Sequence, residues 1–137
     1  MKYAFVTGAA GGLAGACVEE LYRRGGWTIF GADFNEAGLK DLVAKTGDTV
    51  IPVMIDITSQ ASCDEAAEFC KKYTDHMDVV INCAGMHTMA SMVEGDPAGT
   101  EEKMLNVNVL GMMRVNKSFF EMIDKCKGRI INFSSEC

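Results

Sequence analysis

The sequence lacks a hydrophobic stretch long enough to cross a membrane. A transmembrane helix needs about 18 or more consecutive apolar residues, and charged residues or glycine interrupt every apolar run in these 137 residues. The apolar run at residues 1–6 is also too short for the core of a secretory signal peptide. These absences predict a cytosolic protein that does not bind membranes.

Basic residues are too few and too scattered for a nucleic-acid-binding surface. The chain has 13 Lys and Arg residues against 19 Asp and Glu residues, a formal net charge of -6 at pH 7. Nucleic-acid binding depends on clustered Lys and Arg side chains that replace the counterions of the phosphates. We therefore expect no nucleic-acid partner.

Disulfide and metal-binding motifs are missing as well. The six cysteines include no Cys-x-x-Cys pair, and most of them lie in apolar segments. We interpret them as small buried thiols. His76 and His87 have no partner ligands at the spacings that zinc sites use. The sequence thus predicts no metal site.

Short runs rich in Val and Ile alternate with longer segments of helical period, which is typical of a parallel sheet covered by helices. The expected strands are residues 2–6, 27–32, 50–55, 78–82 and 129–133. The expected helices are residues 13–24, a short helix after Asn35, a helix that includes residues 62–73, and a long helix from residue 100 to about residue 125. We predict one α/β domain over residues 1–137, a doubly wound parallel sheet with five strands in the order 3-2-1-4-5.

Three of these helices have candidate N-terminal caps. Asn35 can cap the second helix. Ser62 and Glu65 have the Ser-x-x-Glu spacing of a capping box in the third helix. Thr100 can cap the long helix, which follows a polar loop at residues 86–99.

The first strand runs into a glycine-rich turn that opens a helix, Thr7-Gly8-Ala9-Ala10-Gly11-Gly12-Leu13-Ala14-Gly15. Glycines let the backbone approach a pyrophosphate, and the helix N-terminus offers free N–H groups and positive dipole charge. Asp33 ends strand two, 21 residues after Gly12, where a carboxylate can accept hydrogen bonds from the adenosine ribose. The alternatives are a tight turn without a ligand and a solvated loop acid. Together the two features predict a dinucleotide site.

In series, these segments resemble the short-chain dehydrogenase/reductase family over the whole chain. Thr7-Gly8-x-x-x-Gly12 is similar to the cofactor turn of that family, with Ala14 where a third glycine is usual. Gly11 also fits the spacing of the extended branch, so the turn alone does not choose a branch. The later motifs resemble the classical branch.

Asp56-Ile57 resembles the adenine contact after strand three, and Asn82-Cys83-Ala84-Gly85 is similar to the classical Asn-Asn-Ala-Gly, with Cys83 replacing the second Asn. Asn108, followed by Gly111, matches the family's Asn-x-x-Gly, and Asn106 is the competing choice. Ser134-Ser135 resembles the end of strand five.

The resemblance implies roles for these residues. Asn108 would support a proton-relay water, and Ser135 would hydrogen-bond the oxygen of a small alcohol or ketone substrate. The implied cofactor-binding residues are Thr7, Gly8, Ala10, Gly11, Gly12, Leu13, Asp33, Phe34, Asp56, Ile57, Asn82, Ala84 and Gly85.

The family's base, a Tyr followed four residues later by a Lys, is not in this sequence. Four residues after Tyr3, Tyr22 and Tyr73 stand Thr, Gly and Met. We expect the chain to be the N-terminal, five-strand part of a classical member, inactive by itself. A noncatalytic dinucleotide-binding module is the alternative, and a remnant that binds nothing is a third.

Two further expectations concern the ligand and the assembly. The Asp33 carboxylate would repel the 2'-phosphate of NADP, so we predict NAD as the cofactor. The apolar residues of the long helix are too many for a single buried stripe, and strand five would be an open sheet edge. We therefore expect a homo-oligomer.

Overall fold

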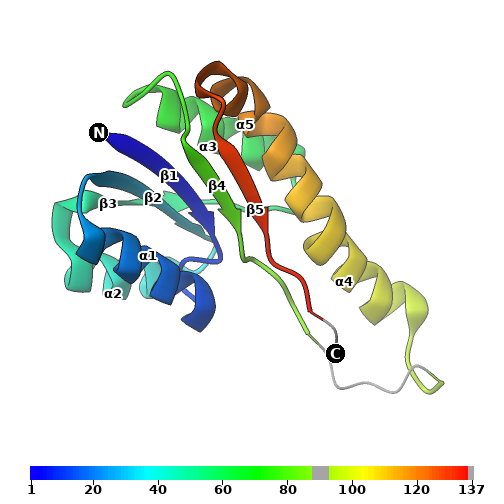
Figure 1. The fold of residues 1–137 in the computed structure, drawn as a ribbon. Helices are drawn as coiled ribbons and strands as arrows, with labels where there is room; N and C mark the ends of the chain where they lie inside the picture. Colours follow the sequence, from blue (N-terminus) through cyan, green and yellow to red (C-terminus); the bar gives the residue numbers. More distant parts are fainter. Residues whose placement is uncertain (88–92, 136–137) are drawn as a thin grey trace.

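The computed structural model describes residues 1–87 and 93–135 and consists of one twisted sheet with helices on both faces (Figure 1). Five parallel strands pair in the order β3-β2-β1-β4-β5. They are β1 (Lys2–Thr7), β2 (Trp27–Asp33), β3 (Val50–Met54), β4 (Val79–Asn82) and β5 (Arg129–Asn132). The fold class and strand order predicted from the sequence are confirmed.

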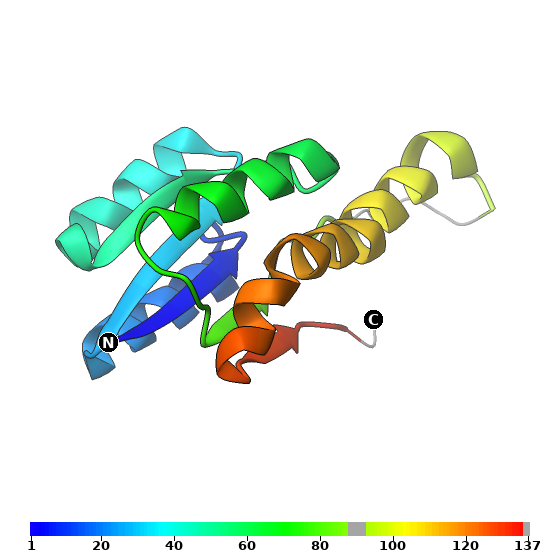
Figure 2. The same cartoon turned by 90° about the horizontal axis from the view of Figure 1, so that it is seen from above.

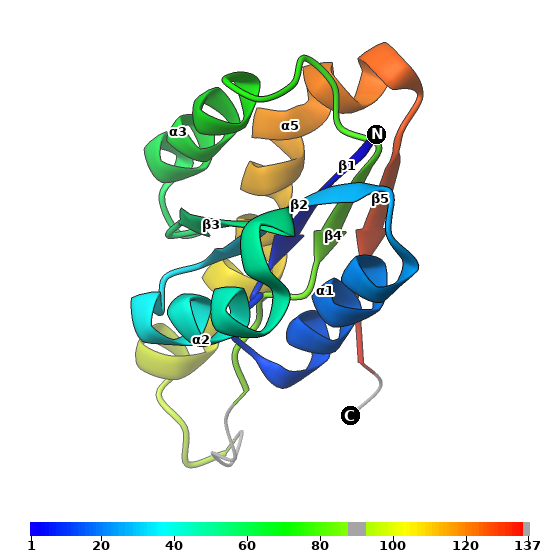
Figure 3. The same cartoon turned by 90° about the vertical axis from the view of Figure 1, so that its left-hand side faces the viewer.

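The helices form two layers. Helices α1 (Gly12–Arg24) and α2 (Glu36–Thr46) cover one face, while α3 (Gln60–Lys71) and α5 (Met112–Cys126) cover the other (Figure 3). Each layer has its own apolar core. One core contains Ala14 and Val18 of α1, and the other contains Phe119 of α5.

Strand β1 lies at the centre of the sheet, which explains its continuous apolar sequence. Ala4, Phe5 and Val6 are each 0% exposed. Successive side chains of a strand point to opposite faces, so Ala4 and Val6 belong to the core under α1 and α2, whereas Phe5 packs on Phe119, with 4.1 Å between ring centroids. A strand covered on both faces cannot alternate polar and apolar residues.

The predicted cap of α2 is confirmed, and the predicted cap of α3 is wrong. Asn35 caps α2, since its side chain accepts a hydrogen bond from the Gly38 N–H. In α3 the cap is Ser59, which accepts from the Ser62 N–H at 3.2 Å. Ser62 therefore lies inside the first turn, where its hydroxyl accepts a hydrogen bond from the Asp56 N–H at 2.9 Å.

The long helical stretch begins earlier than expected and is not a uniform α-helix. A π-helical turn, η2 (Pro97–Glu101), leads into α4 (Glu102–Leu105), and a second π-helical segment, η3 (Asn106–Gly111), leads into α5. The predicted cap at Thr100 is wrong, because its backbone N–H already donates to the Asp96 carbonyl at 2.8 Å. Residues 88–92 of the preceding loop lie outside the described residues.

The stretch from α4 to α5 and strand β5 expose apolar side chains. The N-terminal part of the stretch, yellow in Figures 1 and 2, extends beyond the sheet. Large apolar side chains are exposed along the whole stretch, on β5 and directly after β5. They are Leu105, Val109, Leu110, Met113, Phe120, Ile130, Ile131 and Phe133. Self-association through this surface stays a prediction. No helix in the described part of the chain is long and apolar enough to cross a membrane.

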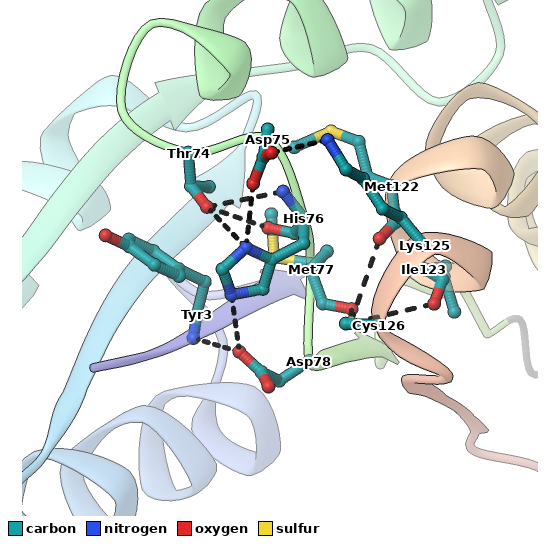
Figure 4. Close-up of polar contacts among 10 residues, drawn as sticks. All are labelled: Tyr3, Thr74, Asp75, His76, Met77, Asp78, Met122, Ile123, Lys125 and Cys126. Carbon is teal, nitrogen blue, oxygen red and sulfur yellow. Dashed lines mark hydrogen bonds and ion pairs between the residues drawn. The ribbon is translucent and has the colours of Figure 1, made fainter.

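A polar cluster joins β1, β4 and α5 at the amino end of the sheet (Figure 4). The Tyr3 N–H donates to Asp78 Oδ2 at 2.7 Å, and His76 Nε2 lies 3.7 Å from the same oxygen. His76 Nδ1 lies 3.0 Å from Asp75 Oδ1, and Lys125 of α5 forms an ion pair with Asp75. The Lys125 ammonium, followed by His76, lowers the pKa of Asp75 to about 2.

We predict that Asp75→Asn lowers the free energy of unfolding at pH 7 but not near pH 2. The folded-state pKa of Asp75 is below its ordinary value of 3.8. The carboxylate therefore contributes stability above about pH 4 and loses it as the pH falls toward 2. Denaturant unfolding across this range measures the difference, with Asp48→Asn as an exposed control. If the free energies of unfolding of Asp75→Asn and the unaltered protein differ by the same amount at every pH, the prediction is contradicted.

Candidate dinucleotide site

The site lies where the strand order reverses, at the carboxyl ends of β1 and β4. These strands are neighbours in the sheet. The chain leaves β1 for α1 on one face, and leaves β4 for the long helical stretch on the other. Adjacent strands whose connections depart to opposite faces leave a crevice between them, and ligands of open α/β sheets bind in such crevices.

The turns after β1 and β4 are in direct contact. The buried Thr7 hydroxyl accepts hydrogen bonds from the backbone N–H groups of Cys83 and Ala84, both at 3.2 Å. Gly8 has a φ of +72°, and a Cβ atom there would lie 2.9 Å from the backbone N and Cα of Ala84. Only glycine fits this position, because it tolerates positive φ and has no side chain.

These turns border a cavity of about 540 Å³. The predicted cofactor-binding residues that line it are Gly8, Gly11, Gly12, Leu13, Asp33, Phe34, Asp56, Ile57, Ala84 and Gly85. Residues that line it but were not predicted are Ala14, Ile55, Thr58, Cys83, Met86 and Val107. All six lie within or next to a motif in the sequence, and that adjacency was an available signal; Val107, for example, lies between Asn106 and Asn108.

The N-terminus of α1 is suited to an anion. Gly11 is the N-cap residue, and no side chain caps the helix. The first N–H groups of a helix have no partner within it, and those of Gly12 and Leu13 belong to residues that line the cavity. No acidic side chain occupies the first turn, so the helix dipole favours a phosphate there.

Asp33 is held at the carboxyl end of β2 by two backbone groups. Its Oδ2 accepts from the Ala10 N–H and its Oδ1 accepts from the Asn35 N–H, each at 3.0 Å. A carboxylate oxygen can accept more than one hydrogen bond, so both oxygens can still accept from ribose hydroxyls. Ala10 does not line the cavity; its part is to orient Asp33. Phe34 lies at the rim and is 80% exposed.

The segment after β3 forms a preorganised wall. Asp56 Oδ1 accepts hydrogen bonds from the Thr58 hydroxyl and N–H, which lower the pKa of Asp56. Ile57 is only 9% exposed and packs against Gly111, where a Cβ atom would lie 2.6 Å from Ile57 Cδ1. The long helical stretch therefore fits closely against this wall.

Asn82 lies in the framework of the site and does not line the cavity. It is 5% exposed, and its Nδ2 donates to Asn116 Oδ1 at 2.7 Å and to Asn132 Oδ1 at 2.9 Å. These bonds join the ends of β4 and β5 to α5. Thr7 does not line the cavity either; its hydroxyl accepts the hydrogen bonds that join the turns after β1 and β4.

The structure separates the two candidate asparagines of the long helical stretch. Asn108 Oδ1 accepts from the Met86 N–H at 2.7 Å, and its Nδ2 donates to the Met86 carbonyl at 2.8 Å. Asn106 instead accepts a hydrogen bond from Arg114. Asn108 is therefore the residue beside the turn after β4, and its role toward a relay water stays a prediction. Ser135 is exposed, follows β5 and does not line the cavity.

Three of the described thiols, Cys63, Cys70 and Cys83, are not activated nucleophiles. Burial raises the pKa of Cys63 to about 11 and of Cys83 to about 12, and it raises the pKa of Cys70 further. Thiols with such values are protonated at neutral pH and react slowly. Among residues 1–87 and 93–135, no group of three or more His, Cys, Asp or Glu side chains could hold a metal ion.

The reversal of strand order at β1 and β4, the uncapped glycine turn and the acid at the end of β2 define a dinucleotide-binding α/β protein. The family model described as short chain dehydrogenase matches residues 2–137, so the chain belongs to the short-chain dehydrogenase family, whose fold implies a nicotinamide dinucleotide. Short-chain dehydrogenase fogD of Aspergillus ruber is 37% identical over 136 residues, which are 98% of this chain and 46% of that protein. Mouse retinol dehydrogenase 16 is 31% identical, over 98% of this chain and 43% of that protein.

Solved structures agree on the fold. A short-chain dehydrogenase/reductase from Saccharomyces cerevisiae superimposes with a TM-score of 0.91 at 23% identity, over 99% of this chain and 54% of that one. The chain thus spans about half the length of the proteins it matches.

We predict that Gly8→Ala destabilises the protein more than Gly25→Ala does. Gly25, at the end of α1, also has a positive φ of 70°, but nothing lies within 4 Å of a Cβ there. Backbone strain alone should cost Gly25→Ala about 1–3 kcal/mol. Gly8→Ala adds the clash with Ala84, so its loss should be larger. Denaturant unfolding compares the two, and equal losses would mean that the turns can separate without cost.

Proposed function

We propose that the protein is an NAD-dependent oxidoreductase that interconverts an alcohol and a ketone by hydride transfer, and that residues 1–137 form its NAD(P)-binding domain. The observation that carries this proposal is the pairing of an uncapped α1 N-terminus with Asp33 on the rim of one cavity. One group suits a pyrophosphate and the other suits a ribose. A nicotinamide cofactor, when bound, would supply or accept the hydride.

The residues of this chain would bind and orient the reactants. The first-turn N–H groups of α1 would hold the pyrophosphate, and Asp33 would accept from the adenosine ribose. The wall at Asp56 and Ile57 would border the adenine. On the substrate side, Ser135 would donate a hydrogen bond to the substrate oxygen, and Asn108 would fix the loop after β4 through Met86.

We infer NAD as the cofactor from the charge at the rim. Both oxygens of Asp33 are fixed by backbone N–H groups, so the carboxylate cannot turn away from a 2'-phosphate without losing those bonds. Like charges placed together at a site cost several kcal/mol. No Lys or Arg lies in the segment from Ala9 to Gly12, and neither Phe34 nor Asn35 is basic. These residues therefore do not offset the repulsion.

We predict that the affinity for NAD is at least about 100-fold higher than the affinity for NADP. Such a ratio is expected when the repulsion costs several kcal/mol. Asp33→Asn removes the charge at similar size and should narrow this ratio. Asp56→Asn removes a carboxylate from the same cavity, away from the ribose, and should leave the ratio unchanged. Calorimetric titration with both cofactors measures it. Equal or tighter NADP binding by the unaltered protein would refute the inference.

We also predict that residues 1–137 alone do not turn over secondary alcohols or ketones. They contain no Tyr with a Lys four residues later, and a positioned acid or base contributes roughly 10²- to 10⁴-fold to the rate. NADH absorbance would be followed for this chain and for a protein that continues into a Tyr-x-x-x-Lys segment. Equal rates would show that the proton donor lies within residues 1–137. Cofactor binding without turnover by the longer protein would favour the noncatalytic module.

A further inference from the structure

The Arg114 side chain connects the cavity wall with the long helical stretch through three hydrogen bonds. It lies in the first turn of α5 and is half-buried. Its Nη1 donates to the Ile57 carbonyl at 3.1 Å and to the Asn106 carbonyl at 3.2 Å. Its Nη2 donates to Asn106 Oδ1 at 2.7 Å. Arg114 does not line the cavity, so any effect on a ligand must pass through these partners.

The partners belong to two segments that are distant in sequence. Ile57 is part of the wall after β3, and its side chain borders the cavity. Asn106 begins η3, the segment that also contains Asn108. The Asn108 side chain in turn forms hydrogen bonds with both the N–H and the carbonyl of Met86. The hydrogen bonds of Arg114 and those of Asn108, joined by the backbone of η3, therefore connect the wall after β3 with the loop after β4.

The geometry calls for an arginine. Three acceptors from two segments surround the side chain, and a planar guanidinium presents donors in several fixed directions. A lysine ammonium keeps the charge but is a single point at the end of a flexible chain. We therefore expect a lysine at this position not to reproduce all three hydrogen bonds. The close contact of Gly111 with Ile57 leaves the wall little room to adjust.

We propose that Arg114 is a positioning residue that fixes the Ile57 wall against the adenosine end of the cofactor and links it to the segment of Asn108. The inference rests on the proposed function, because it assumes that a dinucleotide occupies the cavity. It predicts a selective defect. Binding at the wall should weaken when Arg114 is replaced, whereas anion binding at the N-terminus of α1 should not.

The test uses ADP-ribose, which would contact both the α1 N-terminus and the wall, and inorganic pyrophosphate, which would contact the α1 N-terminus alone. NMR titrations of both probes are compared for the unaltered chain, Arg114→Met, Arg114→Lys and the control Lys117→Met. Lys117 is an exposed cation on the same helix. The expected result is a loss of about 2- to 30-fold in ADP-ribose affinity for both Arg114 variants, the usual size of such indirect couplings. Pyrophosphate affinity should be unchanged throughout.

Each other outcome has a definite meaning. ADP-ribose affinity that is normal in Arg114→Lys would show that charge alone matters and would overturn the positioning role. Equal losses for both probes would indicate general destabilisation and overturn it as well. If Arg114→Met does not fold, Arg114→Lys decides by the same criterion. If the unaltered chain binds pyrophosphate but not ADP-ribose, or neither, the proposed function fails and this inference fails with it.

Discussion

The contact between the turns after β1 and β4 is the constraint on which the rest of the site depends. Thr7 accepts hydrogen bonds from two consecutive N–H groups beyond β4, and Gly8 lies against Ala84 at a distance that leaves no room for a side chain. This contact sets the position of the glycine turn relative to β4. Because α1 starts four residues after Gly8, the contact also sets where its free N–H groups lie. The crevice exists because the two turns touch at their base while their helices depart to opposite faces.

Most polar side chains near the cavity stabilise backbone segments and do not face the ligand space. Thr7 and Asn82 join neighbouring strand ends, and Asn108 holds the loop after β4. The cavity itself is bordered largely by glycine, alanine and aliphatic residues. Such a site offers backbone N–H groups and apolar walls, with Asp33 and Asp56 as its charged groups among the described lining residues. That composition suits a ligand with both phosphates and flat rings. The residues behind the lining hold the lining segments in position.

The long helical stretch shows how packing modifies a helix. Its η3 segment is π-helical where it passes the wall after β3, and there Gly111 fits against Ile57. The same segment carries Asn106 and Asn108, two positions apart, which serve different partners. A π-helical segment changes the direction of successive side chains and is frequent at functional sites. Beyond it, α5 returns to regular geometry and buries Val115 and Phe119 in the core.

The positions of the strands, the cap of α2 and the glycine turn could be predicted from the sequence because they follow from local signals, whereas the strand order came from the doubly wound fold class that the alternation of strands and helices indicates. Continuous Val and Ile runs mark strands buried on both faces, Asn35 caps its own helix, and the glycine turn and Asp33 lie at fixed distances from strand ends. The cap predicted for α3 was wrong: the structure assigns the cap to Ser59, and the Ser62 hydroxyl accepts a hydrogen bond from the Asp56 N–H. The tertiary structure also placed Asn108 beside the loop after β4 and Asn106 against Arg114, and it placed Asn82 behind the cavity. These assignments depend on which segment lies opposite each side chain, and residue spacing along one helix or strand carries no information about that.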